Sequence, residues 1–376
     1  MRFISSALRS LTLFAILLLG VSWGIAGEPG DPDNYQWISP EEHVIQGRIS
    51  HAVVEGYNRL PGHLQNQLRK PVWDLSTNSA GLYIDFKTTA TKIQIRYQVT
   101  QRLSMPHMPA TGVSGVDLYA YNANDDVWEW ASGRYLFKDT ITYTYEQLAT
   151  ATPGRTYRLY LPLYNTVSDL EIGIPNSDSL EFYCADQAPV IVYGTSIAQG
   201  ACASRPGLAW TNILNRKLNQ EVVNLGFSGN GRLEEPILKW IAHTPAKYII
   251  LDCLPNLGIT KYRSEAQVDS LLYNAVLLIR KQQATTPIIL TENSSGFDSH
   301  ILNHSQMRGY ERTTNVARKV FSRLKTEGVS DIYLLDNRSL GLDINSTVDY
   351  VHPNDLGMMY IAEAYYQLLR SIDSNP

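Results

Sequence analysis

A serine lies where a fold built on a parallel sheet would expose it. Ser196 follows the apolar run Val190–Tyr193 in the sequence Tyr-Gly-Thr-Ser-Ile-Ala. Parallel strands end at a common sheet edge, and ligands bind at that edge, so we expect Ser196 there. Because a serine hydroxyl is a poor nucleophile without a neighbouring base, this interpretation requires a histidine supported by a carboxylate.

A histidine and an aspartate of the required kind occur together near the end of the chain. The segment Asp349-Tyr-Val-His352-Pro-Asn precedes the last expected helix. A three-residue spacing allows one tight turn to bring the two side chains together. Asp349 would then accept the proton of one ring nitrogen of His352, leaving the other nitrogen to take the proton of Ser196. The three residues predict acyl transfer through a covalent acyl-serine.

Acyl transfer also needs N–H donors that stabilise the developing oxyanion. The second expected strand ends in Asn-Leu-Gly-Phe-Ser-Gly229-Asn, a flexible turn that can present the backbone N–H of Gly229. The third ends in Asp-Cys-Leu-Pro-Asn256 and offers a side-chain amide. Together with the backbone N–H of Ser196, these groups predict three donors at one sheet edge.

In this set of residues the sequence resembles the SGNH (GDSL-like) hydrolase superfamily. Its Ser, Gly, Asn and His correspond in order to Ser196, Gly229, Asn256 and His352, over about residues 190–369. The resemblance implies a three-layer α/β/α domain with a parallel sheet and an esterase that needs no cofactor and no metal. Two flanks differ, since Gly-Asp-Ser is Gly-Thr-Ser here and Gly-x-Asn-Asp is Leu-Pro-Asn-Leu.

The elements that must position these residues fall into two parts. Residues from about 37 to 181 form short alternating runs broken by turns, which predicts an all-β sandwich of jelly-roll kind. After residue 188, apolar strands alternate with amphipathic helices, as in a parallel sheet covered on both faces. We therefore expect a signal peptide at 1–27, a sandwich domain at 28–186 and a hydrolase domain at 187–376.

The first part carries a second resemblance, through Gly115-Val-Asp-Leu-Tyr119. This segment is similar to the Gly-x-Asp-Leu-Tyr signature of sandwich modules that precede SGNH-type esterases. It implies a bacterial exported esterase that acts on acylated carbohydrate, most simply on O-acetyl groups. Two alternatives stay open: a lipase or lysophospholipase, and a glycan-binding protein whose hydrolase domain is inactive.

Other residues are candidate contacts with the substrate. His107 lies in a Met-Pro-His-Met-Pro loop that could fold over the active site or pack on its own domain. Glu292 follows the fourth expected strand, near the same sheet edge. Trp128 and Trp130 share one face of a strand and fit either the sandwich core or a sugar platform.

Composition excludes several classes of function. A net charge of -4 over 376 residues gives no footprint for nucleic acid. The only apolar run long enough for a membrane, residues 11–26, follows Arg2 and Arg9 and ends in small residues, as in a cleaved signal peptide. We expect a secreted or periplasmic protein without stable membrane insertion.

The chain has three cysteines, Cys184, Cys202 and Cys253, which allow at most one internal disulfide.

Overall fold

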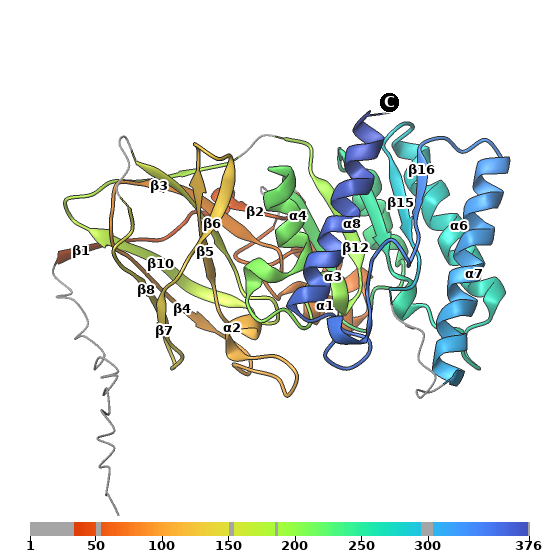
Figure 1. Ribbon diagram of the computed structural model, residues 1–376, viewed down its shortest axis with the longest axis horizontal. Helices are drawn as coiled ribbons and strands as arrows, with labels where there is room; N and C mark the ends of the chain where they lie inside the picture. Colours follow the sequence, from red (N-terminus) through yellow and green to blue (C-terminus); the bar gives the residue numbers. More distant parts are fainter. Residues whose placement is uncertain (1–33, 50–53, 150–153, 185–186, 295–303, 375–376) are drawn as a thin grey trace, which may run out of the picture.

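The computed structural model describes residues 34–49, 54–149, 154–184, 187–294 and 304–374. Two units lie side by side along the long axis of the molecule, one built of antiparallel sheets and one around a parallel sheet (Figure 1). The fold is therefore mixed, with a sheet-rich first part followed by a parallel α/β part, as the sequence predicted. The expected signal peptide at 1–27 lies outside the described residues.

Two antiparallel sheets face each other in the first unit. The first has the order β1 (Tyr35–Ile38), β10 (Val167–Pro175), β4 (Ile93–Val99), β8 (Ile141–Tyr145), β7 (Arg134–Leu136). The second has the order β11 (Leu180–Tyr183), β3 (Tyr83–Thr88), β9 (Arg155–Tyr160), β5 (Asp117–Asn122), β6 (Val127–Ala131), with β2 (Ile45–Gln46) paired to β3. Alternate residues such as Ile93 and Ile95 are buried between the sheets, as a strand with one core-facing side requires. The jelly-roll connectivity stays a prediction.

Five parallel strands form the central sheet of the second unit. Their order is β13 (Val222–Gly226), β12 (Val190–Gly194), β14 (Tyr248–Asp252), β15 (Ile288–Thr291), β16 (Ile332–Leu335). The chain thus places β13 on one side of β12 and the later strands β14, β15 and β16 on the other side. Ser196 follows the end of β12. Such a switch point is where parallel α/β sheets bind ligands.

Helices cover both faces of this sheet. Ile191 and Tyr193 of β12 face a core shared with α5 (Glu235–Ala242), α6 (Glu265–Gln282) and α7 (His304–Thr326). Val190 and Val192 face the opposite core, shared with α4 (Trp210–Leu218) and α8 (Asp355–Ser374). The alternation of apolar side chains along β12 therefore fills two cores at once.

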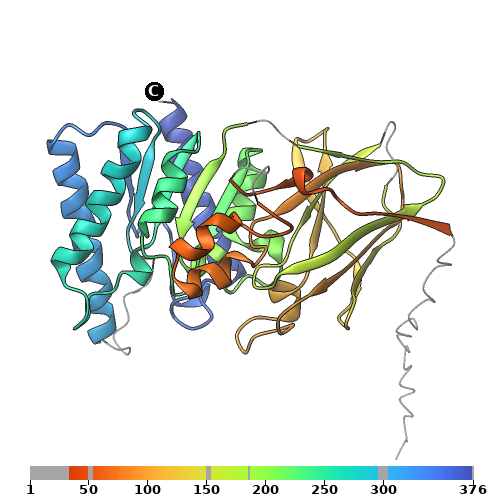
Figure 2. The ribbon, with the colours of Figure 1, turned by 180° about the vertical axis from the view of Figure 1, so that it is seen from behind.

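One segment of the expected sandwich domain packs instead on the parallel sheet. The 3₁₀ helix η4 (Gly62–Gln67) and helix α1 (Lys70–Ser76) bury Leu64, Leu68 and Val72 in the core that contains α5, α6 and α7. Figure 2 shows this segment, in orange, lying on the sheet of the second unit. A single boundary at residue 186 therefore does not separate the two cores, because the chain contributes to the second unit before it completes the first.

A buried ion pair lies where the two units meet. Arg158 of β9 binds both carboxylate oxygens of Asp85, at 2.8 and 2.7 Å, and donates to Asn215 Oδ1 of α4 at 2.6 Å. The Arg158 and Asp85 side chains are only 6% and 1% exposed. The guanidinium also lies over the rings of Tyr83 and Trp128.

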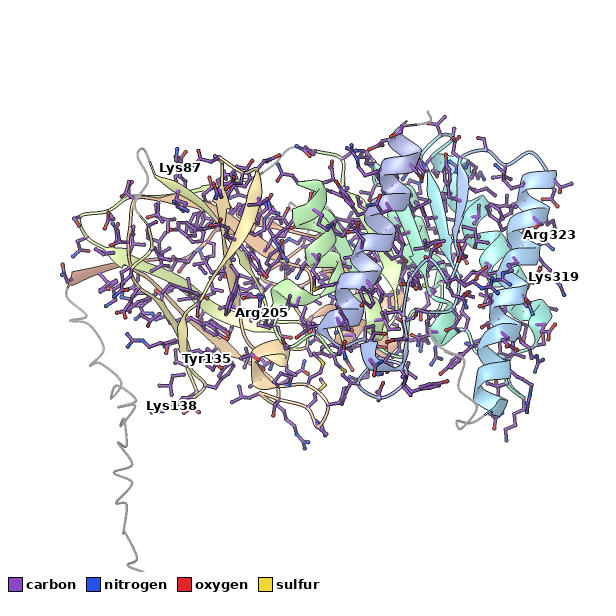
Figure 3. All side chains as sticks on the ribbon, viewed as in Figure 1. Lys87, Tyr135, Lys138, Arg205, Lys319 and Arg323 are labelled. Atoms are coloured by element: carbon purple, nitrogen blue, oxygen red, sulfur yellow. The ribbon has the colours of Figure 1, made fainter. Side chains whose placement is uncertain are left out.

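The two tryptophans of β6 lie beside this contact and not in the sandwich core. Trp128 packs against a cluster of three buried tyrosines, and Trp130 is 50% exposed. Trp130 donates to Asp117, and Arg205 lies over its ring at 4.3 Å; Figure 3 labels Arg205 between the two units. Neither tryptophan therefore lies in the sandwich core, which was one of the two positions expected for them.

None of the three cysteines forms a disulfide; Cys202 and Cys253 are buried and Cys184 is exposed. Within the described ranges, no helix combines the length and apolar character that a membrane crossing needs.

Candidate active site

The sharp turn after β12 positions Ser196. Thr195 follows the strand as the N-cap of the short helix α3 (Ser196–Gln199), and its hydroxyl accepts a hydrogen bond from the backbone N–H of Ile197 at 3.3 Å. A side chain at Gly194 would place its Cβ 2.5 Å from that of Ala198, so the turn needs glycine there. Ser196 is 6% exposed, at the carboxyl edge of the sheet.

The predicted histidine and aspartate lie in hydrogen-bonding contact with this serine. Ser196 Oγ is 2.9 Å from Nε2 of His352, and Nδ1 of His352 is 2.7 Å from Oδ2 of Asp349. The three side chains therefore form a continuous chain from hydroxyl through imidazole to carboxylate.

The loop before α8 holds the imidazole in place through its backbone. The N–H of Val348 donates to the carbonyl oxygen of His352 at 2.9 Å, which closes a tight turn. The N–H of Cys202, just after α3, donates to the carbonyl oxygen of Pro353 at 3.0 Å. The histidine loop is thus bonded directly to the segment that carries the serine.

The environment of Asp349 favours its ionised form. Partial burial would raise the pKa of this carboxyl, but the backbone N–H of His352, at 2.8 Å, and the imidazole ring outweigh it. The pKa of Asp349 therefore lies below its ordinary value. An ionised Asp349 fixes the ring tautomer in which Nε2 can accept the serine proton.

The two predicted oxyanion donors lie on neighbouring loops. Gly229, after β13, has a left-handed backbone with φ of 68°. Asn256 ends the 3₁₀ helix η6 (Leu254–Asn256) after β14, and its Oδ1 accepts from the N–H of Gly231 at 3.0 Å. That bond leaves the Asn256 amide nitrogen as the free end of the side chain.

Three N–H groups at this edge have no acceptor among the residues that the structure describes. They are the backbone N–H groups of Ser196 and Gly229 and the side-chain amide nitrogen of Asn256. The loops that carry them are tied together, since Gln199 of α3 accepts from the N–H of Ser228 at 3.0 Å. Free donors on a rigid support are what a developing oxyanion requires.

His107 lies next to the histidine of the site. Its ring is 6.1 Å from that of His352, centroid to centroid, with the planes 27° apart. The loop is closed by reciprocal backbone bonds between Met105 and Met108, and both methionines pack on the core of the second unit. Of the two interpretations of this loop, the structure favours the one in which it reaches the active site.

Glu292 is not available to a substrate, which corrects its predicted role. The side chain is 1% exposed. Its oxygens bind Nε and Nη2 of Arg318 at 2.5 and 2.8 Å and accept from the N–H of Asn337 at 3.1 Å. The carboxylate joins α7 to the loop after β16, and both of its oxygens are hydrogen-bonded within the protein.

Two polar residues of the site were not singled out from the sequence. Gln199 is buried one helical turn after Ser196, and that spacing could have indicated a supporting role. Tyr164, which follows β9 of the first unit, places its hydroxyl 3.4 Å from the carbonyl oxygen of Ser196. No local pattern indicates this contact, because it joins segments 32 residues apart.

Across the described segments, no group of three His, Cys, Asp or Glu side chains could hold a metal ion.

A parallel sheet whose carboxyl edge holds a hydroxyl–imidazole–carboxylate chain beside free N–H donors is typical of serine hydrolases of the α/β class. Comparison with known families agrees. Residues 187–370 match the GDSL-like Lipase/Acylhydrolase family, and residues 35–180 match the GxDLY family, described as the N-terminus of Esterase_SGNH_hydro-type proteins. The chain is thus an SGNH-type ester hydrolase with a GxDLY N-terminal domain.

Solved structures with a similar fold include a protein from Bacteroides ovatus described as a GDSL-like lipase. It is 28% identical, covers 91% of this chain and 98% of its own, and has a TM-score of 0.81. The salicylyl-acyltransferase SsfX3 from a tetracycline biosynthetic pathway is 18% identical over 91% of this chain and 98% of its own, with a TM-score of 0.72. A family two carbohydrate esterase from Clostridium thermocellum, solved with cellohexaose, is 11% identical over 79% of this chain and 96% of its own, with a TM-score of 0.52. The last two share the fold. No curated protein matches the chain.

Proposed function

We propose that the protein removes short acyl groups, most simply acetyl, from hydroxyl groups of carbohydrate. The observation that carries the proposal is the hydrogen-bonded chain of Ser196, His352 and Asp349, with distances of 2.9 and 2.7 Å. The carbohydrate part rests on the resemblance of both domains to SGNH-type esterases and on the fold shared with carbohydrate esterases.

In this mechanism Ser196 Oγ attacks the ester carbonyl carbon while its proton passes to Nε2 of His352. The N–H groups of Ser196, Gly229 and Asn256 stabilise the oxyanion that forms. The bond from carbon to the sugar oxygen then breaks, and the proton moves from His352 to that oxygen. Water then attacks the acyl-serine while His352 takes a proton from it. His352 returns this proton to Ser196 Oγ, and the carboxylic acid is released.

The first experiment compares hydrolysis of 4-nitrophenyl acetate and 4-nitrophenyl octanoate by the wild type and Ser196→Ala. We expect wild-type activity on the acetate and a loss of kcat on the order of 10³-fold or more in the variant, since the nucleophile is removed. Ser322→Ala, on the exposed side of α7, is the matched control. Unchanged activity in Ser196→Ala would refute the mechanism, and a preference for octanoate would favour a lipase.

The wild type is then incubated with acetylated glycans, and released acetate is measured. Binding of the glycan without any release of acetate, in the wild type as in Ser196→Ala, would instead favour the glycan-binding alternative. Acetate released only by the wild type establishes the carbohydrate esterase.

We further propose that the chain is exported after cleavage of residues 1–27. This rests on the composition of that segment alone. N-terminal sequencing of the protein from the periplasm or culture fluid should begin near Glu28, and an intact Met1 in the mature protein would refute cleavage.

A further inference from the structure

Three arginines from separate parts of the chain surround the loops that carry Gly229 and Asn256. Arg232 Nε and Nη2 donate to the carbonyl oxygen of Gly229 at 3.2 and 3.0 Å. Arg263 Nη1 donates to the carbonyl oxygen of Asn256 at 2.9 Å. Arg69, just before α1, donates through Nη1 to Asn230 Oδ1 at 2.8 Å. The oxyanion loops are thus bordered by positive charge, in a protein whose net charge is -4.

Among the described residues, one of these three charges has a carboxylate partner. Arg69 pairs with Glu234. Within the ranges that the structure describes, Arg232 and Arg263 have no carboxylate within ion-pair distance, and both are partly exposed. Partial burial, and after it repulsion from Arg232 and Arg69, lowers the pKa of Arg263. The guanidinium groups of Arg232 and Arg263 therefore border the neighbouring loops of Gly229 and Asn256 without a carboxylate partner among the described residues.

Both guanidinium groups also have unused donors. A guanidinium carries five N–H groups in a planar fork that matches a carboxylate or sulfate. Arg232 leaves Nη1, and Arg263 leaves Nε and Nη2, without an acceptor among the described residues. Fixing the two backbone carbonyls would not by itself require a charged side chain, so the surplus charge points to an anionic ligand.

The surface next to Arg263 is suited to a sugar ring. Tyr262 is 82% exposed, with the ammonium of Lys261 4.8 Å from its ring centre. A groove of about 610 Å³ continues from Tyr262 and Arg263 between α5 and α6. The carboxylate that lines this groove, Glu235, pairs with Lys239 at 2.7 Å and so leaves Arg263 free. An exposed aromatic face beside cations fits a saccharide that carries acid groups.

We infer that the ester substrate is an anionic glycan, with an acid group of the sugar chain held by Arg232 and Arg263 while the acyl group reaches Ser196. This inference rests on the proposed function and specifies its substrate class. Carboxylate and sulfate share the geometry that a guanidinium binds. The positive charge next to the site would increase kcat/KM by attracting and orienting the charged chain.

The test uses polymers that differ only in charge. Acetylated polygalacturonate is compared with the same polymer after methyl esterification of its carboxylates, and acetylated dextran sulfate with acetylated dextran. We expect the wild type to release acetate from the charged member of a pair with roughly tenfold higher kcat/KM, and this preference to decrease as salt rises from about 20 to about 500 mM. Preference in the first pair alone identifies carboxylate, and preference in both pairs identifies the negative charge in general.

The variants separate charge recognition from support of the oxyanion loops. In Arg232→Gln/Arg263→Gln the ratio of kcat/KM on the charged polymer to that on its neutral form should fall to near one, whereas Arg232→Lys/Arg263→Lys should keep part of it. Lys319→Gln/Lys325→Gln removes two exposed charges from the C-terminal half of α7, where Figure 3 labels Lys319, and should keep the wild-type ratio.

A wild type without charge preference, or a Gln double variant with the wild-type ratio, would overturn the inference. Equal losses on both members of a pair would show that the arginines only support the loops, which also overturns it. Failure of the proposed function is a different result, namely no Ser196-dependent hydrolysis of 4-nitrophenyl acetate.

Discussion

Asn256 shows how one backbone hydrogen bond can orient a side chain for chemistry. Its Oδ1 is held by the N–H of Gly231, so the amide nitrogen is the end left to meet an oxyanion. An aspartate in this position would keep the acceptor and lose the donor. The substitution therefore separates the two functions of the side chain.

We predict that Asn256→Asp lowers kcat on 4-nitrophenyl acetate by about 10²- to 10³-fold, with a small effect on KM, because an N–H donor is lost and a negative charge is added. Asn256→Ala should lose activity and also loosen the loop of Gly231, which a lower melting temperature would report. Asn315→Asp, on the exposed side of α7, controls for the added charge. Wild-type kcat in Asn256→Asp would exclude the amide from the oxyanion hole.

The individual site residues differ in how well the sequence predicts them. Asp349 and His352 are three residues apart, so their contact follows from one local turn. Glu292 was misjudged because its partner Arg318 lies 26 residues away on α7, whose rotation the sequence does not define. The arrangement of Arg69, Arg232 and Arg263 was missed for the same reason, since each comes from a different element.

At the scale of elements, the end of β14 carries a fully buried carboxyl group. Burial raises the pKa of Asp252 to about 7, and a hydrogen bond with Tyr365 only partly opposes this. The pKa in the folded chain thus exceeds that of the unfolded chain. The stability that the folded chain gains by keeping Asp252 protonated is therefore complete below about pH 4, and it is lost as the pH rises toward 7.

We predict that the unfolding free energy of the wild type decreases between about pH 4 and pH 7 relative to that of Asp252→Asn, by roughly 2–4 kcal/mol. Asp252→Asn is the reference because asparagine does not titrate and has nearly the same shape as aspartate. Urea unfolding of both proteins at several pH values measures the difference. A difference that does not vary with pH would show that Asp252 has an ordinary pKa.

The first parallel strand, β12, was predicted to within one residue, because it is a short apolar run followed by turn residues. Helix α1 was missed. It has only seven residues, and the residues that it and η4 bury face a sheet formed more than 100 residues later. A short helix gives little periodicity, and its reason for existing lies in tertiary packing.

At the scale of the whole molecule, the Arg158–Asp85 pair joins the sandwich to α4. We predict that Asp85→Ala lowers the unfolding free energy by about 3–5 kcal/mol, since it leaves a buried guanidinium without its carboxylate. Chemical unfolding followed by fluorescence measures this effect. The double variant Asp85→Leu/Arg158→Met should recover much of the loss, because the unpaired charge is gone. Equal losses in the single and double variants would contradict the assignment.

The segment before α1 also closes one edge of the parallel sheet. Arg59 is completely buried, and its guanidinium donates to the carbonyl oxygens of Asn224 and Gly226 on the edge strand β13, at 3.0 and 2.7 Å. The same guanidinium donates to the carbonyl oxygens of Leu75 and Asn78. Through Arg59, the edge strand is therefore held by hydrogen bonds to a segment that comes before most strands of the sandwich in the sequence.

The contacts of Arg59, η4 and α1 with the parallel sheet limit which fragments of the chain can fold when the gene is divided. A fragment encoding only residues 187–376 would lack Arg59 and the apolar side chains of η4 and α1, so its product would expose a sheet edge and a core face. We therefore expect that residues 187–376, moved alone into another protein, do not fold to a stable hydrolase. The sandwich would then be inherited with the esterase because folding requires the intervening chain, whether or not the sandwich itself ever touches a glycan.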